Sequence, residues 1–303
     1  MGKKVSVISP CHNGASYLNY YFESLLSQTY NDVEFIFVDD GSTDNTKEIY
    51  EKYAGSLKQK GWSCQYIYQE KSGQAAALNQ GLKIFSGEYL IYPDSDDIMY
   101  PFHIEEKVKY MEEHPDVGIA YCVLDAVSYD NLDEVLFQFD FGADGDMFKK
   151  ALNEEKILWT PMGNIIRSSS LLDVIPSRHI YEGLFFGSQN CQVQMPLLYS
   201  CKCGYINKSL GKYVIRTGSS SRTSKQFKRR INVMWVWINT LCSIKRMPLS
   251  ERIYCLSKIF YNNLGVIFKF VIKEIFSIRN YKEEDIKYKL ITIMGLKLKV
   301  KLK

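Results

Sequence analysis

The 303-residue chain lacks the features that mark secreted, disulfide-bonded and membrane-spanning proteins. Its eight cysteines follow no paired spacing, so we expect reduced thiols rather than a disulfide framework or a zinc site. Lys3 and Lys4 lead directly into a short apolar strand, whereas a signal peptide continues into a long apolar segment. No run of about 18 uncharged apolar residues predicts a spanning helix. These absences favour a cytoplasmic location.

A glycine-rich dinucleotide-binding loop is missing as well. The first apolar strand runs into Ser9-Pro10-Cys11-His12-Asn13-Gly14, at the place where a nicotinamide-dependent enzyme carries G-x-G-x-x-G. We therefore exclude that class of enzyme. His12 is interpreted as a pocket or surface residue rather than a catalytic one.

Alternating patterns of apolar residues organise the first hundred residues. Short apolar runs predict strands at residues 5–9, 33–38, 65–68 and 88–92. Helical spacing and capping residues predict the intervening helices at residues 15–28, 42–60 and 73–85. This order predicts an α/β fold with a mostly parallel sheet flanked by helices.

The modest net charge of +4 conceals a division of the chain into two parts. Residues 226–303 hold 17 lysines and arginines against 5 aspartates and glutamates, a net charge of +12, so residues 1–225 carry −8. The serine-rich run at 219–224 predicts a loop between the two parts. We expect residues 226–303 to form a basic, amphipathic helical extension, with helices at about 228–244 and 249–278 and a strand-like alternation at the end.

Aspartates follow two of the predicted strands at the point where each strand ends. Asp39 and Asp40 close the second strand, and Asp94, Asp96 and Asp97 follow the fourth. In open α/β sheets, ligands bind beyond the carboxyl ends of the strands. A carboxylate there can accept a hydrogen bond from the imide N–H of uracil. Two carboxylates one residue apart can hold Mg²⁺ or Mn²⁺, which would neutralise a diphosphate leaving group.

Several motifs, in their order and spacing, resemble those of family 2 glycosyltransferases, which have the GT-A fold. They are Pro10 and Asn13, the stretch from Tyr17 to Tyr30 (Y-L…S-L-L-S-Q-T-Y), V-D-D-G-S-T-D-N-T from Val38, G-Q-A-A-A-L-N-Q-G from Gly73, G-E-Y-L from Gly87 and D-S-D-D from Asp94. The resemblance is close over residues 4–100 and looser to about residue 222. It implies that residues 1–225 form a nucleotide-sugar-binding catalytic domain that inverts the anomeric configuration in a single displacement.

The resemblance also assigns roles to individual residues. Asp40 would bind the nucleobase of the donor substrate, and Asp94 and Asp96 would hold the ribose, the diphosphate and a Mn²⁺ or Mg²⁺ ion. Further contacts to the nucleotide sugar, or support for these carboxylates, would come from Pro10, Asn13, Asp39, Ser95 and Asp97.

Three positions depart from the family's pattern. Leu78 stands where an arginine is common, which removes one cationic partner of the diphosphate. The family's acidic pair, whose aspartate is the general base, corresponds to Gln189 and Asn190, and an amide cannot take up a proton near neutral pH. Three alternatives follow. These amides would only orient the acceptor, or the acceptor would be acidic enough to need little general-base catalysis, or another carboxylate such as Glu182 would be the base. Arg216 stands in place of a histidine, and we expect its guanidinium to contact the diphosphate.

The sequence thus predicts an inverting transferase that moves a hexose or N-acetylhexosamine from a nucleoside diphosphate sugar, with UDP as the expected nucleotide. The acceptor would be a glycan or a lipid-linked glycan in surface polysaccharide synthesis. The alternative is a non-catalytic scaffold that binds nucleotide sugars and has lost its base. Aromatics at helical spacing in the basic extension favour packing or peripheral contact with the inner face of the cell membrane, and they argue against a nucleic acid partner.

Overall fold

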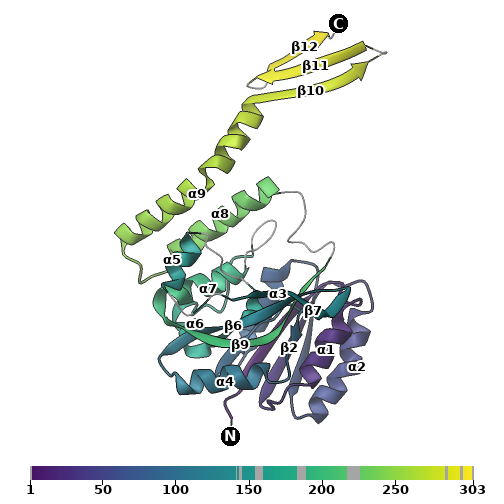
Figure 1. Cartoon of the computed structure of the whole chain (residues 1–303), viewed down its shortest axis with the longest axis vertical. Coiled ribbons are helices and arrows are strands. Elements are labelled where there is room, and N and C mark those ends of the chain that lie inside the picture. Colours follow the sequence, from purple (N-terminus) through teal and green to yellow (C-terminus); the bar gives the residue numbers. More distant parts are fainter. Residues whose placement is uncertain are drawn as a thin grey trace.

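The computed structural model describes residues 2–140, 142, 145–153, 160–182, 189–216, 226–283, 286–293 and 296–301, with side chains described outside 226–232 and 266–301. One large sheet with helices on both faces forms the body of the molecule, and α8 and α9 lead from it to a small separate sheet (Figure 1). The loop expected at 219–224 lies outside the described residues.

The first four strands are parallel, as predicted. β1 (Val5–Cys11) lies between β2 (Val33–Asp40) and the short β4 (Tyr89–Ile91), and β3 (Ser63–Gln69) flanks β2. Every residue of β1, β2 and β4 is buried. Continuous apolar runs of this kind are typical of parallel strands that are covered on both faces.

Helices cover the two faces of this parallel part unequally. α1 (Leu18–Leu26), α2 (Thr46–Gln59) and α4 (His103–Glu113) contribute to one core, in which Phe22 packs against Tyr53 with ring centroids 5.2 Å apart. α3 (Gln74–Ile84) packs on the opposite face in a second core. The Ala-rich sequence of α3 lets its backbone approach the sheet closely, since a Cβ at Gly81 would lie 2.3 Å from Ile8.

The second half of the sheet is not parallel, so the sheet as a whole is mixed. From β4 the order continues through β8 (Asn164–Arg167), β6 (Val117–Ser128), β9 (Lys202–Ile215) and β5 (Ile98–Met99), with β7 (Asn131–Phe139) beside β6. β8 is antiparallel to both of its neighbours, and β6 and β9 are parallel to each other. The predicted parallel order therefore holds for β1 to β4 and ends where β8 joins β4.

The C-terminal part begins with the two predicted helices. Helices that complete the α3 face are α5 (Met147–Leu152), α6 (Ser168–Val174), α7 (Gln189–Ser200), α8 (Gln226–Ser243) and α9 (Leu249–Ile275). Trp237 and Leu241 of α8 and Cys255 and Ile259 of α9 are buried in that core. The start of the extension therefore packs on the body of the molecule.

The description of residues 226–303 as helical is correct only to Ile275. The chain then forms an antiparallel sheet of β10 (Phe276–Glu283), β11 (Ile286–Ile293) and β12 (Leu296–Lys301), at the far end of α9 from the body (Figure 1). The predicted second helix is therefore too long by three residues. The strand alternation expected near the C-terminus is confirmed over β12, because apolar and basic residues alternate there with the period of two that a strand requires.

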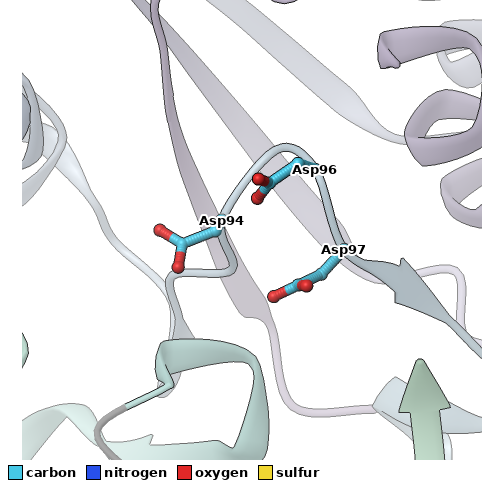
Figure 2. Close-up of side chains that lie close together, drawn as sticks. All are labelled: Asp94, Asp96 and Asp97. Carbon is cyan, nitrogen blue, oxygen red and sulfur yellow. The ribbon is translucent and has the colours of Figure 1, made fainter. Parts of the chain in front are cut away.

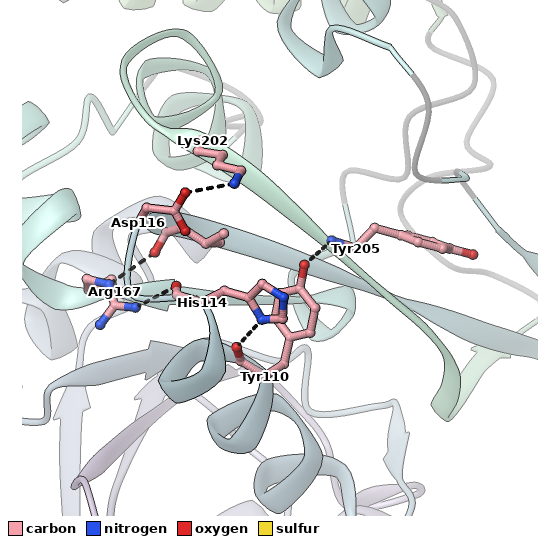
Figure 3. A network of polar contacts seen from close by, with 7 residues as sticks. Tyr110, His114, Asp116, Arg167, Lys202 and Tyr205 are labelled. Atoms are coloured by element: carbon pink, nitrogen blue, oxygen red, sulfur yellow. Dashed lines mark hydrogen bonds and ion pairs between the residues drawn. The ribbon is translucent and has the colours of Figure 1, made fainter.

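Polar contacts hold the start of β9, the strand that ends at the candidate site. Arg167 donates to the carbonyls of Val117 and His114 at 3.0 and 3.3 Å, and Lys202 pairs with Asp116 at 2.7 Å near the start of β9 (Figure 3). The phenol of Tyr110 accepts a hydrogen bond from the backbone N–H of Tyr205 at 3.1 Å (Figure 3). α4 and β6 are thereby tied to the beginning of β9.

A buried pair from α4 holds the middle of the same strand. His103 Nδ1 lies 2.7 Å from the carbonyl of Leu210, and Lys107 Nζ lies 2.9 Å from His103 Nε2. Burial lowers the pKa of Lys107 to about 8 and the pKa of His103 well below its usual range. A neutral imidazole that donates from Nδ1 and accepts at Nε2 fits both contacts.

The eight cysteines are all free of disulfide bonds. Among the helices that the structure describes, none is both long enough and apolar enough to cross a membrane.

Candidate functional site

The site lies at the sheet edge where β1, β2 and β4 end. These strands are parallel neighbours, so the residues that follow them meet at one edge. A cavity of about 360 Å³ opens there. Six of the residues predicted to bind the donor substrate line it, namely Pro10, Asp40, Asp94, Ser95, Asp96 and Arg216. The structure therefore brings the aspartates of two separate motifs to one cavity.

Three carboxylates gather on the turn between β4 and β5 (Figure 2). Asp94, Asp96 and Asp97 each offer an oxygen within 4.8 Å of the others. Asp97 is 1% exposed, and its Oδ1 accepts a hydrogen bond from the backbone N–H of Val214 at 3.1 Å. Gln74 Nε2 donates to Asp94 Oδ1 at 2.5 Å. The turn thus concentrates carboxylates at the cavity.

Burial and mutual repulsion make this negative charge costly. Burial, and then the charge of Asp96, raise the pKa of Asp94 to about 7. The same two causes, in the same order, raise the pKa of Asp97 well above its usual range. Like charges at such distances disfavour ionisation of all members together unless a cation joins them.

The cluster fits a hard divalent cation. Mg²⁺ and Mn²⁺ prefer oxygen ligands, and three carboxylates converge here. Asp97 Oδ2 is buried and has no hydrogen-bond partner among the described residues, so an unsatisfied oxygen faces this cluster. Asp94 and Asp96 remain the residues that would hold such an ion, with Asp97 beside them.

Asp40 also lines the cavity, and it lies against the start of α3. Its Oδ1 accepts hydrogen bonds from Gln69 Nε2 and the Ser72 N–H, both at 2.7 Å, and its Oδ2 accepts one from the Gly73 N–H at 2.9 Å. Each carboxylate oxygen can accept two hydrogen bonds. Oδ2 therefore keeps one acceptor position for a ligand.

Two residues predicted to bind the donor substrate lie behind the cavity instead of lining it. Side chains alternate along a strand, so Asp39 points to the face opposite Asp40, where it accepts hydrogen bonds from Tyr66 at 2.6 Å and from the Ser42 N–H at 2.8 Å. Asn13, with a φ of 52°, accepts from the Thr43 N–H at 2.8 Å. Both residues fix the loop after β2 and shape the cavity indirectly.

Arg216 is the cavity's cationic side chain. Among the described residues that line the cavity it is the only arginine or lysine. Its Nε donates to Asp96 Oδ2 at 3.1 Å, and its guanidinium lies 4.1 Å from the centre of the Tyr17 ring. Leu78 is 1% exposed in the core between α3 and the sheet, so it contributes nothing to the charge of the cavity.

The three candidate catalytic residues, Gln189, Asn190 and Glu182, do not line the cavity. Gln189 and Asn190 begin α7, and Asn190 Oδ1 is buried without a partner among the described residues. Glu182 is exposed, and its Oε1 accepts a hydrogen bond from Asn79 Nδ2 at 3.1 Å. Residues 183–188, which connect Glu182 to α7, lie outside the described part of the chain.

Several residues that line the cavity were not predicted from the sequence. They are Cys11, Tyr17, Gln74, Tyr213 and Val214. Two of these stand inside motifs already recognised, Tyr17 at the start of its stretch and Gln74 directly after Gly73, so their position was available as a signal. Burial raises the pKa of Cys11 to about 12, which keeps its thiol protonated and unsuited to nucleophilic chemistry.

Comparison with known proteins agrees with this geometry. Residues 6–181 match the model of the family described as glycosyl transferase family 2. The chain is 31% identical to the glycosyltransferase GlyG of Streptococcus pneumoniae over 240 residues, which cover 74% of each protein. It is 29% identical to GlyA of the same organism over 271 residues, 85% of this chain but only 35% of GlyA, so the chain spans about a third of that relative.

Solved structures show the same fold. TarS 1-349 of S. aureus in complex with UDP-GlcNAc has a TM-score of 0.61 at 19% identity, covering 89% of this chain and 78% of that one. The mannosyltransferase PcManGT of Pyrobaculum calidifontis, in complex with GDP-Man and Mn²⁺, has a TM-score of 0.58 at 15% identity, covering 90% and 74%. The expected GT-A fold is thereby confirmed. Since the family model matches more than half of the residues, the chain belongs to glycosyl transferase family 2.

Proposed function

We propose that residues 1–225 transfer a sugar from a UDP-sugar to a glycan or lipid-linked acceptor, with inversion at the anomeric carbon. The single observation that carries this proposal is that Asp40, Asp94 and Asp96 line one and the same cavity. A nucleoside diphosphate sugar needs a hydrogen-bond acceptor at its base, which Asp40 would supply, and neutralisation at its diphosphate, which a cation held by Asp94 and Asp96 would supply. TarS, which shares the fold, has been crystallised with UDP and with UDP-GlcNAc.

The carboxylates that line the cavity would have distinct tasks. The free acceptor position on Asp40 Oδ2 suits the imide N–H of uracil. Asp94 and Asp96 would hold a Mn²⁺ or Mg²⁺ ion, which as a Lewis acid would neutralise charge on the leaving diphosphate. Arg216 lies beside Asp96, where it would add a second positive charge near the diphosphate, and its planar guanidinium suits phosphate oxygens.

The acceptor hydroxyl must lose a proton as it attacks. Glu182 is the candidate with a carboxylate, whereas Gln189 and Asn190 offer amides that can only orient the acceptor. The amides at these two positions also favour the alternative, a chain that binds nucleotide sugars without turnover. The two functions differ in whether any sugar leaves the nucleotide.

A thermal-shift panel of nucleotide sugars tests the donor assignment. We expect one UDP-sugar to raise the melting temperature, and to raise it further with Mn²⁺, because a ligand at about 100 times its Kd stabilises the native state by about 2.7 kcal/mol. UDP-glucose, UDP-galactose, their N-acetylamino forms and GDP-mannose form the panel, and ATP with Mn²⁺ is the matched control. If GDP-mannose alone or no nucleotide sugar shifts the transition, the UDP-sugar proposal is wrong.

A second proposal concerns residues 226–303, which we infer to contact an anionic membrane surface peripherally. Opposite its buried Cys255 and Ile259, α9 exposes a row of large apolar side chains, each at least 42% exposed: Leu249, Ile253, Tyr254, Phe260, Tyr261 and Leu264. The same part of the chain carries a net charge of +12. Segments that combine exposed apolar side chains with basic residues bind anionic membrane surfaces. Each Lys or Arg near the surface contributes about 1 kcal/mol of electrostatic attraction.

Vesicle co-sedimentation tests the membrane proposal on the full chain. The protein should bind vesicles that contain anionic phospholipid at low salt and should dissociate as the salt concentration rises. The double variant Phe260→Ser/Tyr261→Ser should bind about tenfold more weakly. Tyr68→Ser, which removes an equally exposed aromatic ring from β3, should leave binding unchanged. Equal binding by the double variant, or no binding by the unmodified chain, would contradict the proposal.

A further inference from the structure

Arg216 is bound to Asp96, one of the two carboxylates that would hold the metal ion. Its Nε and its Nη2 both donate to Asp96 Oδ2, the first at 3.1 Å. The two side chains are only 26% and 23% exposed, so water screens the pair incompletely. Since a carboxylate oxygen offers two acceptor positions, both positions on Oδ2 are taken.

A second contact holds the guanidinium in this place. The Arg216 guanidinium lies 4.1 Å from the centre of the Tyr17 ring, within the range of a cation–π interaction. Tyr17 is itself 9% exposed and packs in the core beneath α1, so it forms a fixed support. Arg216 is therefore positioned from two sides and does not simply project into solvent.

The remaining carboxylates of the cluster have no such cation. Asp94 takes a hydrogen bond from neutral Gln74, and Asp97 Oδ2 has no partner among the described residues. The cavity thus contains three carboxylates and one guanidinium, and the guanidinium is bound to the member that the proposed metal site requires.

We propose that Arg216 and a divalent cation compete for Asp96, and that the diphosphate of the donor substrate resolves the competition by drawing Arg216 away. Phosphate oxygens accept the two parallel N–H groups of an arginine at least as well as a carboxylate does. Binding of metal without nucleotide is then weak, and nucleotide and metal strengthen each other's binding reciprocally. The inference rests on the proposed function in that it takes Asp94 and Asp96 as metal ligands.

Mn²⁺ titration followed by the electron paramagnetic resonance of the free ion measures this competition directly. Arg216→Gln should bind Mn²⁺ about tenfold more tightly than the unmodified chain when no nucleotide is present. With saturating UDP the difference should shrink to less than about twofold, because Arg216 has then left Asp96 in the unmodified chain. Equal or weaker Mn²⁺ binding by Arg216→Gln without nucleotide would overturn the proposal.

Three further variants separate competition from other effects. Lys71→Gln removes an equal charge from a side chain that contacts His12 at the cavity but does not contact Asp96, and it should change Mn²⁺ affinity by less than about twofold. Tyr17→Leu keeps every charge, loosens Arg216 and should tighten Mn²⁺ binding a few-fold. Asp96→Asn in the Arg216→Gln background should abolish the gain. If Lys71→Gln increased the Mn²⁺ affinity as much as Arg216→Gln does, the cause would be general electrostatics and not competition for Asp96. If the increase persisted in Asp96→Asn, the ion would bind at another site.

This experiment measures only the binding of Mn²⁺, so its result does not depend on whether the chain transfers sugar. A chain that shows the exchange but transfers no sugar would contradict the proposed enzymatic function and leave the competition intact. If the unmodified chain transferred sugar but bound Mn²⁺ with the same affinity as Arg216→Gln, the enzymatic function would stand and the competition would be contradicted.

Discussion

Asp96→Asn is expected to lower the rate of sugar transfer by about a thousandfold or more while the protein remains folded. The change removes the charge of the carboxylate that would hold the cation at the diphosphate and keeps its shape. A metal ion at a leaving group supplies several kcal/mol of transition-state stabilisation, and about 4 kcal/mol corresponds to a factor of about 10³ in rate. Release of UDP from the donor identified by the thermal-shift panel, followed with an acceptor or by slow hydrolysis, measures the effect.

The matched control for this prediction is Asp116→Asn. It makes the same isosteric change in a surface ion pair with Lys202 (Figure 3), and neither residue lines the cavity. Transfer should stay within about twofold of the unmodified chain, because surface ion pairs contribute little to stability. A rate within about tenfold of the unmodified chain in Asp96→Asn would place the diphosphate elsewhere. Binding without turnover in every form would instead identify the chain as a nucleotide-sugar-binding scaffold.

Glu182→Gln is expected to reduce kcat by roughly 10²–10⁴ and to leave donor binding unchanged. This is the range by which a positioned general base accelerates proton transfer. Glutamine retains an oxygen for the hydrogen bond from Asn79, so the loop keeps its local support while the ability to take up a proton is lost. Single-turnover transfer together with the thermal shift given by the donor separates these two quantities.

Asn190 supplies the comparison for Glu182. If its amide orients the acceptor, Asn190→Ala should raise the acceptor KM and change kcat much less than Glu182→Gln does. Asn190→Asp combined with Glu182→Gln should recover part of the lost rate if a carboxylate at the start of α7 can reach the acceptor. Full activity of Glu182→Gln would eliminate this carboxylate as the base. Glu113→Gln, on the exposed end of α4, controls for loss of an acidic group in general.

The parallel half of the sheet could be predicted because short stretches of the sequence are enough to identify its strands and helices. β1, β2 and β4 contain short apolar runs, each connection from β1 to β4 contains a helix, and right-handed crossovers then bring the strand ends together. This is why Asp40, Asp94 and Asp96 could be expected in one place from the order of residues alone. The alternation that turns Asp39 away from Asp40 was equally visible in the sequence, and overlooking it assigned Asp39 a direct contact.

The other half depended on contacts that the sequence pattern does not reveal. β8 is a short strand that joins β4 and β6 from far along the chain, and nothing in its apolar run shows whether it pairs antiparallel. Tyr213, Val214 and Arg216 reach the cavity only because β9 lies beside β5 and β6. Beyond Ile275 the mixture of apolar and basic residues has features of both periods, so the end of α9 was placed too late.

The late arrival of β8 has a consequence for synthesis of the protein. β4 is bordered on one side by β1 and on the other by β8, whose residues leave the ribosome long after those of β4. Until then the apolar residues of β4 form an open edge with unpaired N–H and C=O groups, which is a template for pairing with another chain. Nascent chains from which β4 has emerged without β8 are therefore expected to be prone to aggregate through this edge.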